Sequence, residues 1–140
     1  MTFRWLRAPE DLSPVFTVRE DVFIREQGFH DEFDERDNSC WHLLCEENGR
    51  PAGCARIFPE EQGVWHIGRV AVEKPFRGAG VGAAIMEACH RKILELGGSA
   101  AVLSAQCRAS GFYEKLGYRV TSSEYLDEHC PHVDMRRTLP

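Results

Sequence analysis

The chain has 140 residues, of which 43% are hydrophobic and 28% are charged, and its formal net charge is −5. This length fits one domain, residues 1–140, and the composition excludes collagen-like, low-complexity and disordered classes. No apolar stretch approaches the ~18 residues that cross a bilayer, and the first residues lack the apolar core of a signal peptide. We therefore expect a cytoplasmic protein that does not contact membranes.

The charge is unevenly distributed along the chain. Residues 1–68 carry 7 basic and 14 acidic side chains, whereas residues 69–92 carry 5 basic and 2 acidic ones. A general nucleic-acid binder needs a wide basic surface, so we expect no nucleic-acid partner, but the short basic segment suits a local anion site. The acidic run at residues 31–37 is typical of a solvated loop. A second interpretation is that the acidic N-terminal half attracts a cationic substrate such as a polyamine.

The six cysteines form no recognisable disulfide or metal pattern. The missing export signal favours reduced thiols over disulfides. Cys40-Trp41-His42, together with Cys45, is a local cluster of zinc-type ligands, but no second matching pair follows. We expect no metal site, and we interpret the cluster as a strand whose alternate residues are buried.

The first half of the chain predicts one helix followed by an antiparallel sheet. Ser13-Pro14 is typical of a helix start, and apolar residues at helical spacing continue to Gly28. Asn48-Gly49 is a strong hairpin signal, because both central residues of its turn adopt positive φ. The sequence thus predicts a helix over residues 13–28 and strands over residues 41–46, 51–58 and 64–72.

The second half predicts a long helix and a further strand–helix–strand unit. From Gly80 to Leu96 the apolar residues trace one helical stripe, which ends at Gly97-Gly98. A short apolar run over residues 100–105 suits a buried strand, a short helix fits residues 109–116, and two strands fit residues 118–125 and 133–138. The complete order predicts a mixed α+β fold with helices packed on one sheet.

A glycine-rich turn at residues 77–82 carries the clearest chemical signal. It links the strand Arg69–Val72 to the long helix, so backbone N–H groups and the positive helix end converge where a phosphate binds favourably. No lysine follows the glycines, which excludes a P-loop. Gly78, Gly80 and Ala83 formally match a dinucleotide fingerprint, but three antiparallel strands precede them and the ribose-binding carboxylate is missing. The other interpretation is a turn that only lets helix and strand pack closely.

Arg77, Gly80 and Gly82 also match the pattern Arg/Gln-x-x-Gly-x-Gly/Ala. In this loop, in the strand before it and in Phe112–Tyr118, the sequence resembles the GNAT superfamily of N-acetyltransferases. It is similar in particular to the ElaA-like subgroup, through residues 19–27, 103–106 and 124–132 with Met135-Arg136. It departs from that subgroup at residues 128–130, so the resemblance does not predict the shape of the last loop, although the expected fold is unaffected.

The resemblance implies a fold and a donor. The fold is that of the acyl-CoA N-acyltransferases, a central, mostly antiparallel twisted sheet of about six to seven strands flanked by about four helices. The donor is acetyl-CoA, whose pantetheine arm would pair with Val70, Ala71 and Val72, where a backbone N–H polarises the thioester carbonyl. Its pyrophosphate would lie on the loop Arg77, Gly78, Ala79, Gly80, Val81 and Gly82, with Arg77 adding charge.

The resemblance also implies direct transfer of an acetyl group to a primary amine of a small molecule, peptide or protein. Tyr113 matches a family tyrosine that hydrogen-bonds the cofactor sulfur, so it is the expected general acid, with a packing role as the other interpretation. His66, on the strand that polarises the carbonyl, is the expected base, because histidine titrates in a suitable range. Acceptor-binding side chains are expected among Glu26, Arg69, Glu124 and His132. Glu26, Glu124 and His132 suit helix capping or loop bracing equally well, and the alternatives for Arg69 are the cofactor, an acidic acceptor group or a buried carboxylate such as Glu26.

Two further expectations follow. The central strand lacks an obvious carboxylate base, which makes a catalytically silent acyl-CoA-binding module the alternative function. Paired sheets between protomers of the family suggest, by analogy alone, a homodimer.

Overall fold

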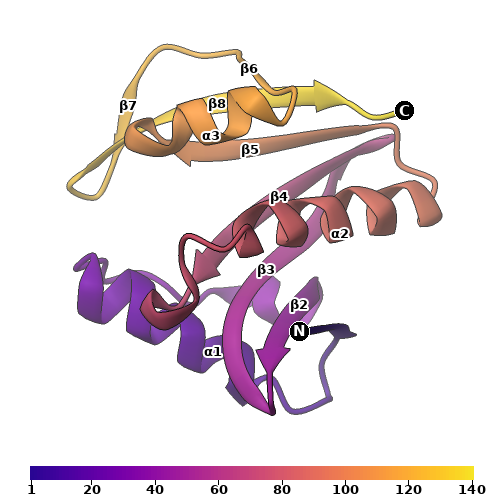
Figure 1. Cartoon of the computed structure of the whole chain (residues 1–140). Coiled ribbons are helices and arrows are strands. Elements are labelled where there is room, and N and C mark those ends of the chain that lie inside the picture. Colours follow the sequence, from indigo (N-terminus) through magenta and orange to yellow (C-terminus); the bar gives the residue numbers. More distant parts are fainter.

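Eight strands form one open, mostly antiparallel sheet in the computed structural model, which describes residues 1–140 (Figure 1). The strand order is β1-β2-β3-β4-β5-β8-β6, and β7 pairs with β8 beyond this path. The strands are β1 (Thr2–Leu6), β2 (Trp41–Glu47), β3 (Arg50–Glu61), β4 (Val64–Val72), β5 (Ala100–Gln106), β6 (Arg119–Val120), β7 (Tyr125–Asp127) and β8 (Cys130–Thr138). The predicted mixed α+β class is confirmed. The sheet has more strands than the expected six to seven because it includes β6 and β7, which are only 2 and 3 residues long.

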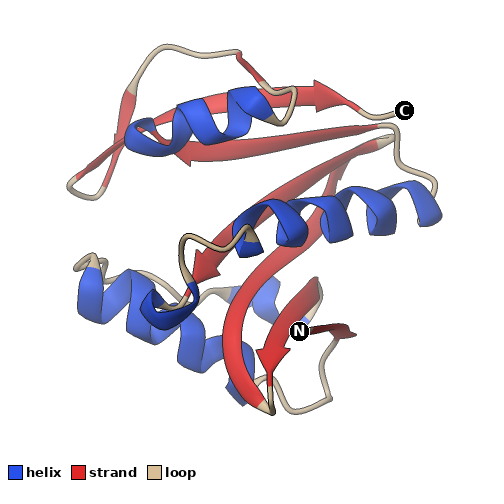
Figure 2. Ribbon diagram, viewed as in Figure 1, coloured by secondary structure: helices blue, strands red, loops and turns tan.

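Three α-helices pack on this sheet (Figure 2). They are α1 (Ser13–Arg19), α2 (Val81–Glu95) and α3 (Ser110–Lys115), accompanied by a π-helical segment η1 (Glu20–Glu26) and the 3-10 turns η2 (Glu35–Asn38), η3 (Lys74–Phe76) and η4 (Cys107–Ala109). Neighbouring residues of β2 pack on opposite faces of the sheet. Leu43 belongs to the apolar cluster that contains residues of α2, and Leu44 belongs to the cluster that contains residues of α1. Because successive strand side chains point to opposite faces, this apolar strand contributes to two cores.

The helix predicted over residues 13–28 is continuous but changes its winding. After Arg19 the chain continues as η1, and the Gln27 N–H donates to the Val22 carbonyl five residues earlier. Gly28, at a φ of 76°, then turns the chain away. The sequence did not predict β1, because only Leu6 of its five residues is buried and its pattern therefore carries little signal.

The predicted meander is confirmed. Asn48 and Gly49 adopt φ values of 51° and 77°, as the hairpin turn requires. The strand predicted to end at residue 58 continues to Glu61, so the second hairpin turns at Gln62-Gly63.

The single strand predicted over residues 118–125 is wrong. Only β6 and β7 are extended there, and a loop separates them. In that loop the Ser122 hydroxyl accepts a hydrogen bond from the Asp134 N–H at 2.9 Å, so a side chain takes the place of a backbone partner. β8 in turn starts at Cys130, three residues before the predicted residue 133.

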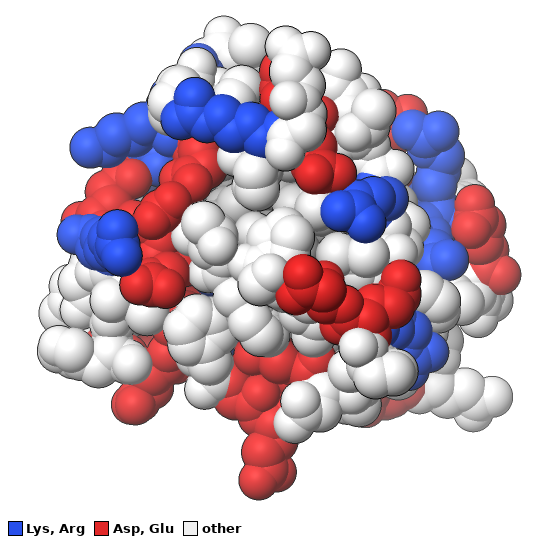
Figure 3. Space-filling model, turned by 90° about the horizontal axis from the view of Figure 1, so that it is seen from below, with Lys and Arg blue, Asp and Glu red and all other residues white.

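The surface carries mixed charge. On the face seen from below, Lys and Arg side chains lie scattered among Asp and Glu side chains (Figure 3). Among the helices, none has the length and apolar character that crossing a membrane requires.

Candidate active site

β4 and β5 pair only where they begin. Parallel pairing joins Val64–His66 to Ala100–Val102, after which the two strands diverge (Figure 1). Beyond His66, backbone N–H and C=O groups on this side of β4 have no strand partner, and such groups need a ligand or water as partner. A cavity of about 310 Å³ occupies the wedge between the two strands.

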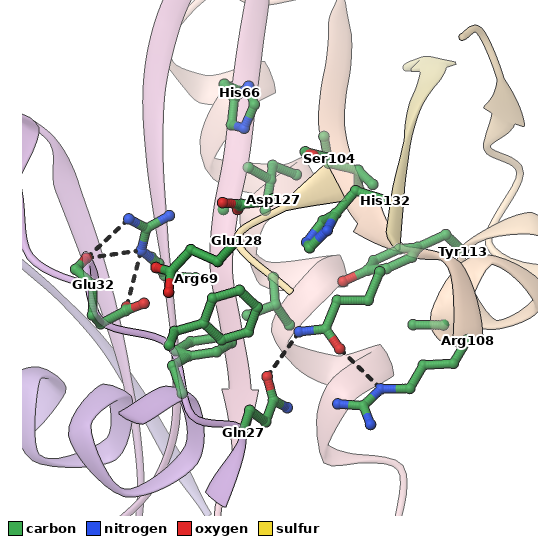
Figure 4. A pocket seen from close by; sticks show the side chains of 18 of the residues that line it. Gln27, Glu32, His66, Arg69, Ser104, Arg108, Tyr113, Asp127, Glu128 and His132 are labelled. Atoms are coloured by element: carbon green, nitrogen blue, oxygen red, sulfur yellow. Dashed lines mark hydrogen bonds and ion pairs between the residues drawn. The ribbon is translucent and has the colours of Figure 1, made fainter. Parts of the chain in front are cut away.

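The cavity brings together four of the predicted catalytic and acceptor-binding residues. His66, Arg69, Tyr113 and His132 line it, together with Val70 of the predicted pantetheine strand (Figure 4). Glu26 and Glu124 do not line it. Glu26 instead borders a neighbouring cavity at the end of η1, and Glu124 is exposed just before β7.

Arg69 lies at a bulge in β4 beside the cavity. The register with β3 shifts so that Ala71 and Gly68 oppose Cys54 and Arg56, which leaves one extra residue on β4. Arg69 adopts a φ of 52°, a left-handed conformation that is unusual for a residue with a side chain. The structure thus bends β4 away from β5 at the point where the cavity opens.

The acidic run at residues 31–37 is solvated only in part, because Asp31, Asp34 and Glu35 are exposed while its other two carboxylates are buried. Glu32 and Asp37 are 5% and 4% exposed, and Arg19, at 1%, contacts both carboxylates at 2.9 and 2.7 Å. Arg56 contacts Asp37 at 2.9 Å and Asp34 at 2.7 Å, and its hydrogen bonds lower the pKa of Asp34 to about 2. The solvated-loop prediction is wrong for Glu32 and Asp37, because their basic partners are distant in sequence and a local charge count does not find them.

Tyr113 projects from α3 toward the cavity (Figure 4). Its ring packs edge-on against Tyr118 at a centroid distance of 6.0 Å, so it has a packing role as well. Burial raises the pKa of the Tyr113 hydroxyl to about 12. At neutral pH the group is therefore a phenol and can donate a hydrogen bond into the cavity.

Two histidines reach the cavity from different strands. His66 of β4 stacks on Phe58 with ring centroids 4.8 Å apart, and its Nδ1 lies 3.2 Å from a carboxylate oxygen of Glu60. Burial lowers the pKa of His66, partly offset by Glu60. His132 of β8 is 6% exposed, and its Nδ1 lies 2.9 Å from the Cys130 carbonyl oxygen.

The glycine loop after β4 has the backbone geometry that an anion site needs. Gly78 and Gly80 both have a φ of 81°, and a Cβ on either would meet no atom within 4 Å. Glycine is thus required by the backbone, and the space above the loop is open. Gly80 is the N-cap of α2, whose first-turn N–H groups have no intrahelical acceptor.

Sequence reasoning did not single out Gln27 and Gln106. The Gln106 amide donates to the Gln27 side-chain oxygen at 2.8 Å, and Arg108 donates to Gln106 at 2.9 Å (Figure 4). This chain of side chains connects the end of η1 to the end of β5. Both glutamines lie in the segments that resemble the ElaA-like subgroup, which is the signal that could have identified them.

The predicted cluster of zinc-type ligands does not come together as a set, because Cys45 is buried in the apolar core while Cys40 and His42 lie beside Asp37. Ligand atoms of Asp37, Cys40 and His42 lie within 4.8 Å of one another. The Asp37 carboxylate, however, is already bound by Arg19 and Arg56, and burial raises the pKa of the Cys40 thiol to about 11. Two guanidinium groups beside a protonated thiol do not fit a cation.

The chain resembles known proteins along nearly its whole length. A family model described as an acetyltransferase (GNAT) domain matches residues 15–139. A Bacillus subtilis protein described as an acetyltransferase is 39% identical, over 98% of this chain and 96% of its own. A protein described as an N-acetyltransferase from Lactobacillus plantarum superposes with a TM-score of 0.92 at 27% identity, covering 99% and 98% of the two chains. Escherichia coli ElaA superposes with a TM-score of 0.87 at 25% identity, covering 97% and 98%. The chain therefore belongs to the GNAT family of acetyltransferases and is an ElaA-like member of it.

Proposed function

We propose that the protein transfers the acetyl group of acetyl-CoA directly to a primary amine. The observation that carries this proposal is the divergence of β4 from β5. It leaves a free backbone edge on β4 that leads from a cavity lined by Tyr113 into the glycine loop of α2. A long, amide-containing thioester cofactor with an anionic end matches such a path.

In this proposal the pyrophosphate binds the loop Arg77–Gly82. The positive φ of Gly80 and the free first-turn N–H groups of α2 support this assignment, because they offer donors and a favourable dipole to an anion. The pantetheine amides pair with Val70, Ala71 and Val72. The Val72 carbonyl already accepts a 2.8 Å hydrogen bond from Arg77 Nε, so Arg77 and the pantetheine arm would meet at this residue.

The chemistry needs a polarised carbonyl and a leaving thiolate that receives a proton. A backbone N–H of the diverged β4 edge polarises the thioester carbonyl. The amine nitrogen bonds to the carbonyl carbon and the C–S bond breaks. The Tyr113 phenol, which burial keeps protonated, donates to the departing sulfur.

Ligand binding and turnover test the proposal in sequence. We expect acetyl-CoA and CoA to raise the melting temperature while NADH does not, because a ligand that binds the folded state stabilises it by mass action. Product formation is then followed by NMR or mass spectrometry with putrescine, spermidine and 2-phenylethylamine, since a thiol reagent would also react with the protein's cysteines. The absence of a shift with both CoA species contradicts the donor assignment, and binding without turnover favours the silent module instead.

A further inference from the structure

We infer that His132 is the general base that takes the proton from the acceptor ammonium ion. The inference rests on the proposed acetyl transfer and assigns a step that this chemistry requires. A primary amine is largely protonated at neutral pH, and only its neutral form is a nucleophile. A group inside the cavity must therefore accept a proton before the C–N bond forms.

The hydrogen bond of His132 determines its tautomer. Its Nδ1 lies 2.9 Å from the Cys130 carbonyl oxygen, and because a carbonyl only accepts, Nδ1 carries the proton. In the neutral ring the lone pair is then on Nε2, which has no hydrogen-bond partner in the protein. Phe29 and Tyr125 flank the imidazole at centroid distances of 6.3 and 6.2 Å. His132 is thus a buried residue, 6% exposed, with a free proton acceptor.

The position of His132 suits the reacting nitrogen. In Figure 4 the imidazole of His132 and the phenol of Tyr113 both point into the cavity, whereas His66 lies at the far end from Tyr113. The carbon that the amine attacks is bonded to the sulfur that receives the Tyr113 proton. The amine nitrogen must therefore approach close to Tyr113. Of the two histidines, His132 meets this requirement, and His66 stays at the base of the wedge between β4 and β5.

Charged groups from several elements line the cavity together with His132. Four carboxylates line it, from Asp31, Glu32, Asp127 and Glu128. The other ionisable groups are the imidazole of His66, the phenols of Tyr113 and Tyr125 and the guanidinium groups of Arg69 and Arg108. Arg69 is paired with Glu32 at 2.9 Å, which leaves an acidic excess. This environment favours an acceptor that arrives as a cation and has to lose a proton.

The proton transfers balance. The ammonium ion gives one proton to Nε2 of His132, and the neutral amine attacks the thioester carbon. When the tetrahedral adduct collapses, the C–S bond breaks and Tyr113 gives its proton to the thiolate. The nitrogen then loses a second proton, which reprotonates the Tyr113 phenolate. The imidazolium returns its proton to solvent, so that one proton is released for each acetyl group transferred.

The substitution His132→Asn tests the role, because the asparagine amide can still donate to the Cys130 carbonyl but has no group at the Nε2 position. With wild-type turnover established, we expect kcat/KM for 2-phenylethylamine to fall by about 100-fold or more near pH 7, with the acetyl-CoA Kd unchanged. The loss should shrink as pH rises. It should also be small with 2,2,2-trifluoroethylamine, which is mostly unprotonated at that pH. A purely structural role would reduce turnover of both amines equally.

Two further variants and a spectroscopic measurement complete the test. His129 lines the neighbouring cavity and not this one, so His129→Asn should match the wild type. His66→Asn should affect both amines alike. If His66→Asn shows the amine-dependent loss instead, or if His132→Asn shows none, the inference is overturned while the proposed function stands. If the wild type transfers no acetyl group to any amine, both fail. NMR of ¹⁵N-histidine-labelled protein should show His132 as the Nδ1–H tautomer, and an Nε2–H tautomer would contradict the inference independently of activity.

Discussion

The carboxylate of Glu26 holds the guanidinium group of Arg77 through two short contacts, Nη2 to Oε1 at 2.7 Å and Nη1 to Oε2 at 2.8 Å. A third donor of Arg77, Nε, is bound to the Val72 carbonyl at 2.8 Å. The pair joins the end of η1 to the start of the glycine loop. It also sets a negative charge beside the loop on which we propose that pyrophosphate binds.

We predict that Glu26→Gln strengthens CoA binding. The substitution removes one negative charge near the pyrophosphate and releases Arg77 from its ion pair, so the Kd for CoA should fall several-fold at low ionic strength and less at high salt. Isothermal titration calorimetry at two salt concentrations measures both effects. Glu20→Gln, which breaks the exposed Glu20–Arg25 pair on the same segment, is the matched control and should leave the Kd unchanged. Weaker CoA binding by Glu26→Gln would mean that the ion pair positions the loop.

The sequence predicted those parts of the fold whose signals are local. The helix Val81–Glu95 and the Asn48-Gly49 hairpin follow from a helical apolar stripe and from turn residues that accept positive φ. The strand β1 and the break between β6 and β7 could not be predicted in the same way. β1 is mostly exposed, and the break depends on Ser122, whose partner Asp134 is twelve residues away.

The same distinction holds for the candidate site, where only the residues in local motifs could be predicted. The glycine loop and Tyr113 belong to short motifs, and a motif can be read without knowing the fold. The buried network around Glu32 depends on Arg19, Arg56 and Arg69, which come together only through the sheet and the helix packed on it. The free Nε2 of His132 likewise depends on a backbone carbonyl that no sequence pattern identifies.

We predict that Gly80→Val abolishes CoA binding while Gly97→Val does not. The two glycines lie at opposite ends of α2, have φ values of 81° and 88°, and would place a Cβ in open space, so the backbone strain is alike. Both variants should lose a similar amount of stability, about 1–2 kcal/mol. Only the side chain at position 80 stands where the pyrophosphate is proposed to bind. A thermal-shift titration with CoA on both variants measures this, and equal CoA binding by the two would place the cofactor elsewhere.

We predict that Glu32→Gln is strongly destabilising. Arg19 is 1% exposed, and the substitution removes one of its two anionic partners, while the strained Arg69 loses the carboxylate that faces it at 2.9 Å. Loss of one partner from a buried ion pair costs about 3 kcal/mol or more in free energy of unfolding, which urea unfolding measures. Glu46→Gln removes the partner of the exposed Arg4 and should cost less than about 1 kcal/mol. Equal effects of the two substitutions would show that the network around Glu32 adds no stability.

We predict that His90 makes the protein less stable as pH falls from about 6.5 to about 4. Burial and the nearby Arg137 lower the pKa of His90 from 6.5 to about 4. Arg137 donates to Nδ1 at 3.2 Å, so the neutral ring carries its proton on Nε2, which lies 2.6 Å from the Tyr118 hydroxyl. Between those two pH values the unfolded chain binds a proton at His90 that the folded chain does not. The free energy of unfolding therefore decreases by roughly 3 kcal/mol across this range and is regained as pH rises.

The difference between wild type and His90→Gln isolates this contribution, because the other titrating groups are shared. Glutamine can accept from Arg137 and donate to Tyr118, so the fold should tolerate it. We expect the two stability curves, measured by urea unfolding from pH 7.5 to 4, to converge or cross as pH falls, with the wild type losing more. Parallel curves for wild type and His90→Gln would mean that the folded protein protonates His90 at its ordinary pKa, and that Arg137 and burial do not oppose the charge.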